Sequence, residues 1–172
     1  VNICTTLSEA ISKLHDLEEP IYHRMINPGS IIVCDYGLKE GYVPYLIGFD
    51  FSKFDKQSEY ATVIDVYNKE VERQNENNED NFKYICPNDL HVNSNSNFGE
   101  KEIYALGVLF IRNLKGELKP KKDEIDLLNE IEKQYSPELA DLLERMISEA
   151  AMERPDANTV YSVFKEALEE YK

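Results

Sequence analysis

The sequence predicts a mainly α-helical domain of the α+β class, with a small β-hairpin near its start. The 172 residues are 42% apolar and 30% charged, which is the composition of a globular chain and not of a disordered one. Apolar residues recur at helical spacing in residues 7–17 and again in residues 103–168. Two short apolar runs, 30–35 and 43–49, are separated by a glycine-containing stretch, as the strands of a hairpin are. The length fits one domain over residues 1–172.

The first expected element is a helix that begins near Thr6. Thr6 followed by Glu9 has the spacing of a capping box, and Pro20 ends the helix because proline cannot continue one. The apolar face of this helix consists of Leu7, Ala10, Ile11, Leu14 and Leu17.

Residues 55–99 are rich in asparagine and serine, and most of them show no apolar period. We therefore expect a long loop, within which residues 61–71 could form a short helix. Long loops inside compact domains are uncommon and often functional.

Four helices are expected after residue 100. The clearest start is Ser136, a capping residue that precedes Pro137 and Glu138, and Asp156 is the cap expected for the last helix. The apolar positions that mark these helices are Ile103, Leu106, Phe110 and Ile111; Ile125, Leu128 and Ile131; Leu139, Leu142, Leu143, Met146 and Ile147; and Val160, Val163, Phe164, Ala167 and Leu168.

The charge balance argues against nucleic acids and membranes as partners. The chain has 33 acidic and 19 basic residues, a formal charge of −14, whereas nucleic-acid backbones and anionic lipids are themselves negative. No run of 18 apolar residues is present, so no transmembrane helix is expected. The first residues do not have the pattern of a signal peptide, and the Val at position 1 indicates a fragment or a processed product.

The cysteines indicate a reduced, cytoplasmic protein. Cys4, Cys34 and Cys86 are odd in number, far apart in the sequence and form no C-x-x-C pair. A disulfide framework and a zinc site are therefore not expected.

Five strings occur in the order in which protein kinases carry similar ones. Residues 23–32 (HRMINPGSII) resemble the catalytic loop HRDLKPENIL, and residues 46–53 (LIGFDFSK) resemble LIDFGFSK. Residues 84–88 (YICPN) resemble Y-x-A-P-E, and residues 102–108 (EIYALGV) resemble DIYSLGV of the central helix of the large lobe. Residues 153–157 (ERPDA) resemble KRPTA.

This resemblance to the protein kinase superfamily covers residues 6–172 and implies the fold of a kinase C-terminal lobe. Residues 55–99 then correspond to the activation segment. The N-terminal lobe is not in this chain, since no glycine-rich strand-turn-strand or VAIK-like string is found. The GFDFS variant is also similar to degenerate kinase-like domains of fungal proteins.

The residues at the positions where kinases do chemistry have changed. The resemblance places Met25 at the catalytic Asp, and a thioether cannot accept a proton as that general base does. Asn27 replaces the lysine that steadies the γ-phosphate, and Ser30 replaces the metal-binding asparagine. Gly48 replaces the metal-binding Asp of DFG, although Mg²⁺ sites usually include one or two carboxylates. No cofactor or metal is therefore expected.

A shifted alignment leaves one alternative open. If Asp50-Phe51-Ser52 is read as the DFG string, Asp50 becomes a metal ligand, with Ser30 as a further contact to metal or phosphate. The protein would then be a divergent Ser/Thr kinase that uses Mg-ATP and whose small lobe lies outside this chain. In the unshifted alignment, Asp50 is a local turn or cap residue.

Other kinase-like residues are expected to be structural. The resemblance places His23 and Phe49 in the hydrophobic spine of the large lobe, with His23 as a core histidine. Arg24 completes the retained His-Arg pair. Glu102 takes the place of the helix Asp that holds the catalytic-loop backbone.

Arg154 corresponds to the arginine that pairs with the Glu of A-P-E, where this chain has Asn88. A buried arginine without a carboxylate is costly. We therefore expect Arg154 to have another partner or to be partly exposed.

The sequence thus favours a catalytically inactive, pseudokinase-like domain. As a scaffolding or allosteric module it would bind another protein or another domain of its own protein, and its acidic charge favours a basic partner surface. Two alternatives stay open: the divergent kinase, and an unrelated helical adaptor whose string matches are chance.

Overall fold

The structure is a computed structural model that describes residues 1–37, 41–55, 69–70, 72–73, 84–86, 97–115 and 124–170. The described part is mainly helical, with two small antiparallel sheets, in agreement with the predicted α+β class. Its helices are α1 (Asn2–His15), α3 (Phe98–Lys115), α4 (Glu124–Gln134), α5 (Pro137–Met146) and α6 (Ala157–Glu170). Its strands are β1 (Ile21–Tyr22), β2 (Ile31–Asp35), β3 (Tyr42–Leu46) and β4 (Lys53–Phe54).

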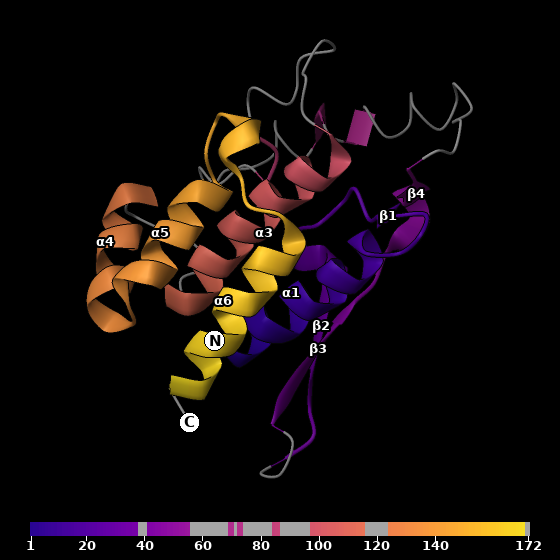
Figure 1. Cartoon of the computed structure of the whole chain (residues 1–172). Helices are drawn as coiled ribbons and strands as arrows, with labels where there is room; N and C mark the ends of the chain where they lie inside the picture. Colours follow the sequence, from indigo (N-terminus) through magenta and orange to yellow (C-terminus); the bar gives the residue numbers. More distant parts are fainter. Residues whose placement is uncertain are drawn as a thin grey trace.

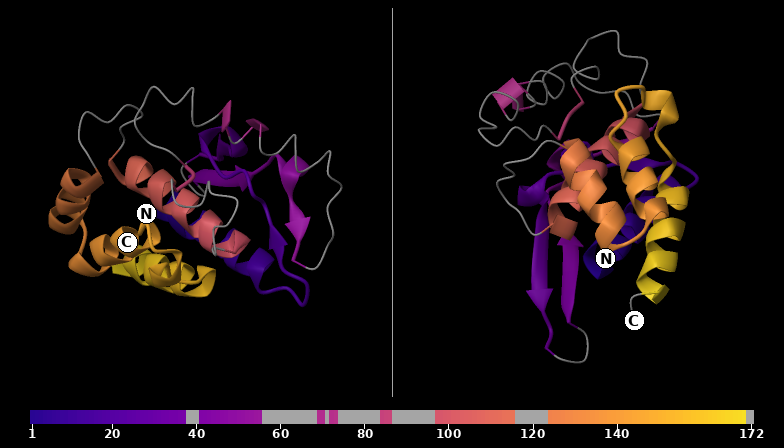
Figure 2. Two further views of the ribbon diagram at one scale, coloured as in Figure 1. Left: turned by 90° about the horizontal axis from the view of Figure 1, so that it is seen from above. Right: turned by 90° about the vertical axis from the view of Figure 1, so that its left-hand side faces the viewer.

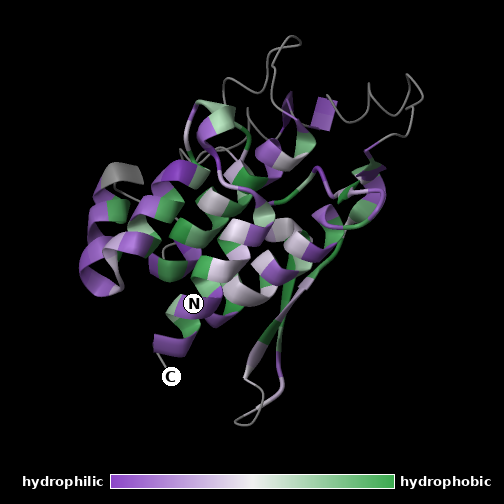
Figure 3. Cartoon of the chain, in the orientation of Figure 1, coloured by the Kyte–Doolittle hydropathy of each residue, from purple (hydrophilic) through white to green (hydrophobic). Residues whose placement is uncertain are grey.

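Helix α3 is the centre of the molecule, and its side chains are buried along most of its length. It packs against α1, α4 and α5, and α6 packs across α1 and α5 (Figures 1 and 2). Among its buried side chains, Phe110 meets Phe164 of α6 edge to face, with ring centroids 4.9 Å apart. Figure 3 shows the apolar residues of the helices gathered on the sides that face one another.

The predicted hairpin is confirmed. Strands β2 and β3 pair in antiparallel register from Ile31 opposite Leu46 to Asp35 opposite Tyr42. Ile31 and Leu46 pack against the helical core, so the base of the hairpin is anchored while its far end extends past the helices (Figures 1 and 2).

The second sheet, between β1 and β4, was not expected. It consists of two residue pairs, Ile21 opposite Phe54 and Tyr22 opposite Lys53. This short ladder pairs the segment before residues 23–30 with the segment after the hairpin. It therefore brings together the two ends of the stretch that contains the 23–30 loop and the hairpin.

Two details of the first helix differ from the prediction. The helix begins at Asn2, so Thr6 lies inside it, and the Thr6 hydroxyl donates to the Asn2 carbonyl instead of capping. The helix ends at His15, which leaves Leu17 outside it and 47% exposed. A threonine inside a helix commonly donates its hydroxyl to the carbonyl of the preceding turn.

The later helix starts are as predicted. Ser136 accepts a hydrogen bond from the Leu139 amide at 3.1 Å, and Asp156 accepts one from the Thr159 amide at 2.7 Å. Most of the predicted loop 55–99, including most of residues 61–71, lies outside the described residues. None of the helices in the described ranges has both the length and the apolar character needed to cross a lipid bilayer.

Candidate functional site

The loop of residues 23–30, whose sequence was compared with the kinase catalytic loop, connects β1 to β2. It is folded around two of its own side chains. The Asn27 side chain accepts from the Gly29 amide at 2.8 Å and donates to the Met25 carbonyl at 3.2 Å. The Ser30 hydroxyl accepts from the Asn27 amide at 3.1 Å and donates to the Asn27 carbonyl at 2.8 Å. The side chains at two expected catalytic positions therefore serve the loop's own backbone.

Glu102 of α3 bonds the backbone of this loop, which is the contact that the resemblance implies for this position. The two carboxylate oxygens of Glu102, which is 3% exposed, have different partners. One accepts from the Arg24 amide at 2.5 Å, and the other lies 2.7 Å from Nε2 of His15 at the end of α1. Arg24 has φ of 70°, in the left-handed region. Such a backbone persists in a residue other than glycine when its surroundings enforce it, which the Glu102 contact does here.

His23 is the core histidine that the sequence predicts, with no exposed surface. Its Nδ1 accepts from the Met25 amide at 3.3 Å, so its Nε2 donates to the Ile47 carbonyl at 2.8 Å. Phe49 meets the His23 ring edge to face, with ring centroids 4.6 Å apart. Phe49 is 42% exposed, so it is not buried as a residue of a hydrophobic spine would be. His23 thus joins the loop to the segment that follows β3.

Gly48 and Asp50 occupy the segment where a metal site was considered. Gly48 has φ of 80°, and Asp50 is an exposed residue of the one-turn helix Phe49–Phe51. The Ser30 hydroxyl, the other oxygen considered, is buried and bonded within the loop. This donor set does not fit Mg²⁺, which prefers several oxygen ligands in octahedral geometry, including carboxylates. Within the described ranges, no three His, Cys, Asp or Glu side chains gather as a metal site.

Arg154 is buried and has other partners, which was the first of the two expectations. Its Nε donates to the Ser148 carbonyl at 2.9 Å and its Nη1 to the Glu100 carbonyl at 3.0 Å. Its guanidinium also lies 5.1 Å from the centre of the Tyr104 ring. Arg154 therefore fastens the chain before α6 to the first turns of α3. Asn88 lies outside the described residues.

One cluster near the loop was missed by the sequence analysis. The side-chain cations of Arg24, Lys53 and Lys101 lie 4.7, 5.1 and 5.9 Å from the centre of the Phe98 ring. These residues come from the loop, β4 and α3, so no local motif could have revealed the cluster. It gives this acidic chain a local concentration of positive charge.

Tyr22 borders the same cluster and packs against His15 and Phe98, with ring centroids 5.1 and 5.9 Å away. Its pKa is raised from its ordinary value, chiefly by partial burial and then by the Asp55 and Glu102 carboxylates. The phenol is therefore held in its protonated form beside the Glu102 network.

Comparison with known proteins identifies no family for this chain. No protein-family model matches it, and no curated protein matches it either.

Proposed function

We propose that this chain is a kinase-like large lobe without phosphotransferase activity, which acts as a protein-interaction module. The observation that carries the proposal is the bonding of the 23–30 loop. Asn27 and Ser30 bond the loop backbone, while Met25 and Gly48 supply no carboxylate where a kinase needs a base and a metal ligand.

The contacts that hold this loop favour a protein domain that keeps an interaction role over one that has simply lost its function. Glu102 accepts from the Arg24 amide and His23 Nδ1 accepts from the Met25 amide, so the loop backbone is held in place although its side chains are unsuited to the reaction. The partner in this proposal is another protein or another domain of the same protein, in the cytoplasm. The net charge of −14 favours a basic partner surface.

Calorimetric titration with ATP, in the presence of Mg²⁺ or Mn²⁺, tests the lack of nucleotide chemistry. We expect no heat of binding up to millimolar ATP, and no phosphate transfer to a mixture of basic protein substrates. Asp50→Ala should behave as the unchanged chain, and Ser30→Ala serves as its matched control.

The divergent kinase makes the opposite forecast. Metal-dependent ATP binding that is lost in Asp50→Ala and kept in Ser30→Ala would establish the shifted alignment. That result would overturn the proposed function.

A further inference from the structure

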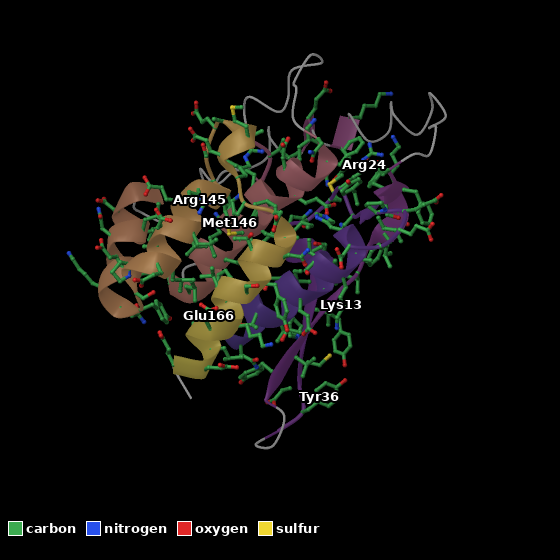
Figure 4. The ribbon with its side chains drawn as sticks, viewed as in Figure 1. Lys13, Arg24, Tyr36, Arg145, Met146 and Glu166 are labelled. Carbon is green, nitrogen blue, oxygen red and sulfur yellow. The ribbon has the colours of Figure 1, made fainter. Side chains whose placement is uncertain are left out.

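The β2–β3 hairpin presents an apolar face to solvent, on the side away from the helices. Strand register places Ile32, Cys34, Tyr36, Val43, Tyr45 and Ile47 on this side, which we call the outer face. The four largest of these side chains are between 38% and 53% exposed. Figure 4 shows Tyr36 near the far end of the hairpin, well away from Arg24 and the 23–30 loop.

The outer face is organised by two tyrosines. The hydroxyls of Tyr36 and Tyr45 lie 2.9 Å apart and hydrogen-bond to each other across the sheet. The Cys34–Val43 pair lies between their positions in the ladder and is half-buried. This arrangement makes a preformed apolar surface, which loses little side-chain entropy when it is covered.

One edge of strand β2 has no strand partner among the described residues, where β2 pairs with β3 alone. No residue of β2 is fully buried. Ile32 and Val33 point to opposite sides of the sheet, and both are more than 40% exposed. An unpaired strand edge offers backbone donors and acceptors to an added strand.

A cavity lies beside β2 on the inner side of the hairpin. It has a volume of about 290 Å³ and is lined mostly by apolar side chains of β2, α1 and α3, among them Val33, Leu7 and Leu109, with Arg112 and Asn113 of α3 as polar members of the lining. An apolar cavity of roughly 150 Å³ holds a benzene molecule, so the volume of this one is sufficient for an aromatic side chain. Strand addition uses these elements together, since the edge bonds the backbone and pockets receive alternate side chains.

The charges at the two ends of the hairpin indicate which kind of peptide segment could pair with β2. Asp35 ends β2, and Asp50 follows the base of the hairpin; both are exposed. The outer face between them carries no charged residue, and the whole chain has a formal charge of −14. An apolar segment with basic residues at its ends complements this pattern.

We propose that the edge of β2 that does not pair with β3 binds an extended segment of another protein as an added strand. This segment is apolar, has an aromatic anchor and is flanked by Lys or Arg. The inward-facing aromatic side chain enters the cavity beside Val33, and the alternate side chains extend the outer face. This inference rests on the proposed function, because it names the partner of the interaction module.

The test is a titration of the chain with the peptide Lys-Lys-Val-Thr-Phe-Thr-Val-Lys-Lys, followed by calorimetry and amide hydrogen exchange. We expect micromolar binding and slower exchange of β2 amides. The double variant I32S/V33S should weaken binding roughly tenfold or more, because it removes apolar contacts on both sides of the edge. D35N/D50N should weaken it severalfold and reduce its dependence on salt.

Matched controls separate this site from general stickiness. L17S and M152S remove exposed apolar side chains elsewhere, 47% and 88% exposed, and should leave binding unchanged. A peptide with proline at every second position cannot form the ladder, and one with Glu in place of Lys reverses the charge; both should fail to bind.

Three results would overturn the inference. They are absence of binding at millimolar peptide, equal binding by I32S/V33S, and a dimer of the chain alone that I32S/V33S dissociates, which would make a second copy the occupant. Each is independent of ATP titration, so the inference can fail while the proposed function stands. Mg-ATP binding would instead remove the proposed function.

Discussion

Glu102 is a buried support of the 23–30 loop. Its buried carboxylate bonds both the Arg24 amide and His15, so its removal leaves a buried amide without its acceptor. We expect Glu102→Ala to reduce the free energy of unfolding by about 3 kcal/mol in urea denaturation. Glu102→Gln, which keeps one acceptor oxygen, should cost less.

Glu9 offers a matched control for that variant. It also pairs with a basic residue, Lys13, but on the solvent-facing side of α1. Glu9→Ala should therefore change stability little, since exposed ion pairs contribute little. Similar losses in Glu9→Ala and Glu102→Ala would contradict the role assigned to Glu102.

Cys4 should make stability depend on pH in the alkaline range. Complete burial raises the pKa of its thiol from 9.0 to about 12, while unfolding returns the thiol to water. Below pH 9 both states hold the proton, and above it only the folded state does. Stability should therefore fall as the pH rises from about 9 to about 12, by roughly 1.4 kcal/mol per pH unit from this group.

Comparison of unfolding curves from pH 8 to pH 11 isolates this effect, because other titrating groups are common to all variants. Cys4→Ala should lose the additional slope, and Cys34→Ala, which retains Cys4, should keep it. Parallel pH profiles for Cys4→Ala and the unchanged chain would show that the buried thiol is not the source.

At the scale of elements, Gly107 sets the distance between α3 and α5. A Cβ at this position would lie 2.8 Å from both Ile147 and Met146 side-chain atoms. Gly107→Ala should therefore destabilise the fold by about 1–3 kcal/mol, because a packed core resists added volume.

Gly99, in the first turn of the same helix, is the control. A Cβ there would meet the Asn97 side-chain oxygen at 3.2 Å and nothing closer, and alanine favours the helix. Gly99→Ala should thus cost less than Gly107→Ala in thermal unfolding. The reverse order would mean that α3 and α5 separate easily.

The elements that the sequence predicted are those with local signals. Ser136 and Asp156 cap their helices as their sequence context indicates, and the hairpin follows two apolar runs around its glycines. The β1–β4 ladder was missed because two-residue strands have no period to detect. Thr6 misled the prediction because its hydroxyl bonds the helix backbone as readily as it caps one.

The candidate site was only partly predictable for a similar reason. The roles of His23 and Glu102 followed from the resemblance, and both make the expected kinds of contact. The partners of Arg154 and the cations around Phe98 depend on residues far apart in the chain. Such contacts exist only after folding, so a motif of adjacent residues does not encode them.

At the scale of the whole molecule, the charge of −14 should make stability rise with salt. The like charges repel one another more strongly in the folded chain than in the expanded one. Raising NaCl from about 0.01 M to about 0.15 M shortens the Debye length from about 30 Å to about 8 Å. We expect the Tm to rise by a few degrees.

Differential scanning calorimetry at matched pH measures this change, with a neutral osmolyte as the control for effects other than screening. A Tm that falls with salt would show that attractive pairs such as Lys13–Glu9 outweigh the overall repulsion.

The packing of α1 on α6 has a consequence for synthesis. The Thr5 hydroxyl donates to the Phe164 carbonyl, a contact across 159 residues of sequence, and Ser12 bonds Asn158. On the ribosome, α1 must therefore wait until α6 has been made, roughly 10–30 s later at ordinary rates of elongation. During that interval β3 and α3 are already made and can cover part of α1, but the side of α1 that packs on α6 has no native cover. That side of the helix therefore stays exposed on the nascent chain until α6 emerges.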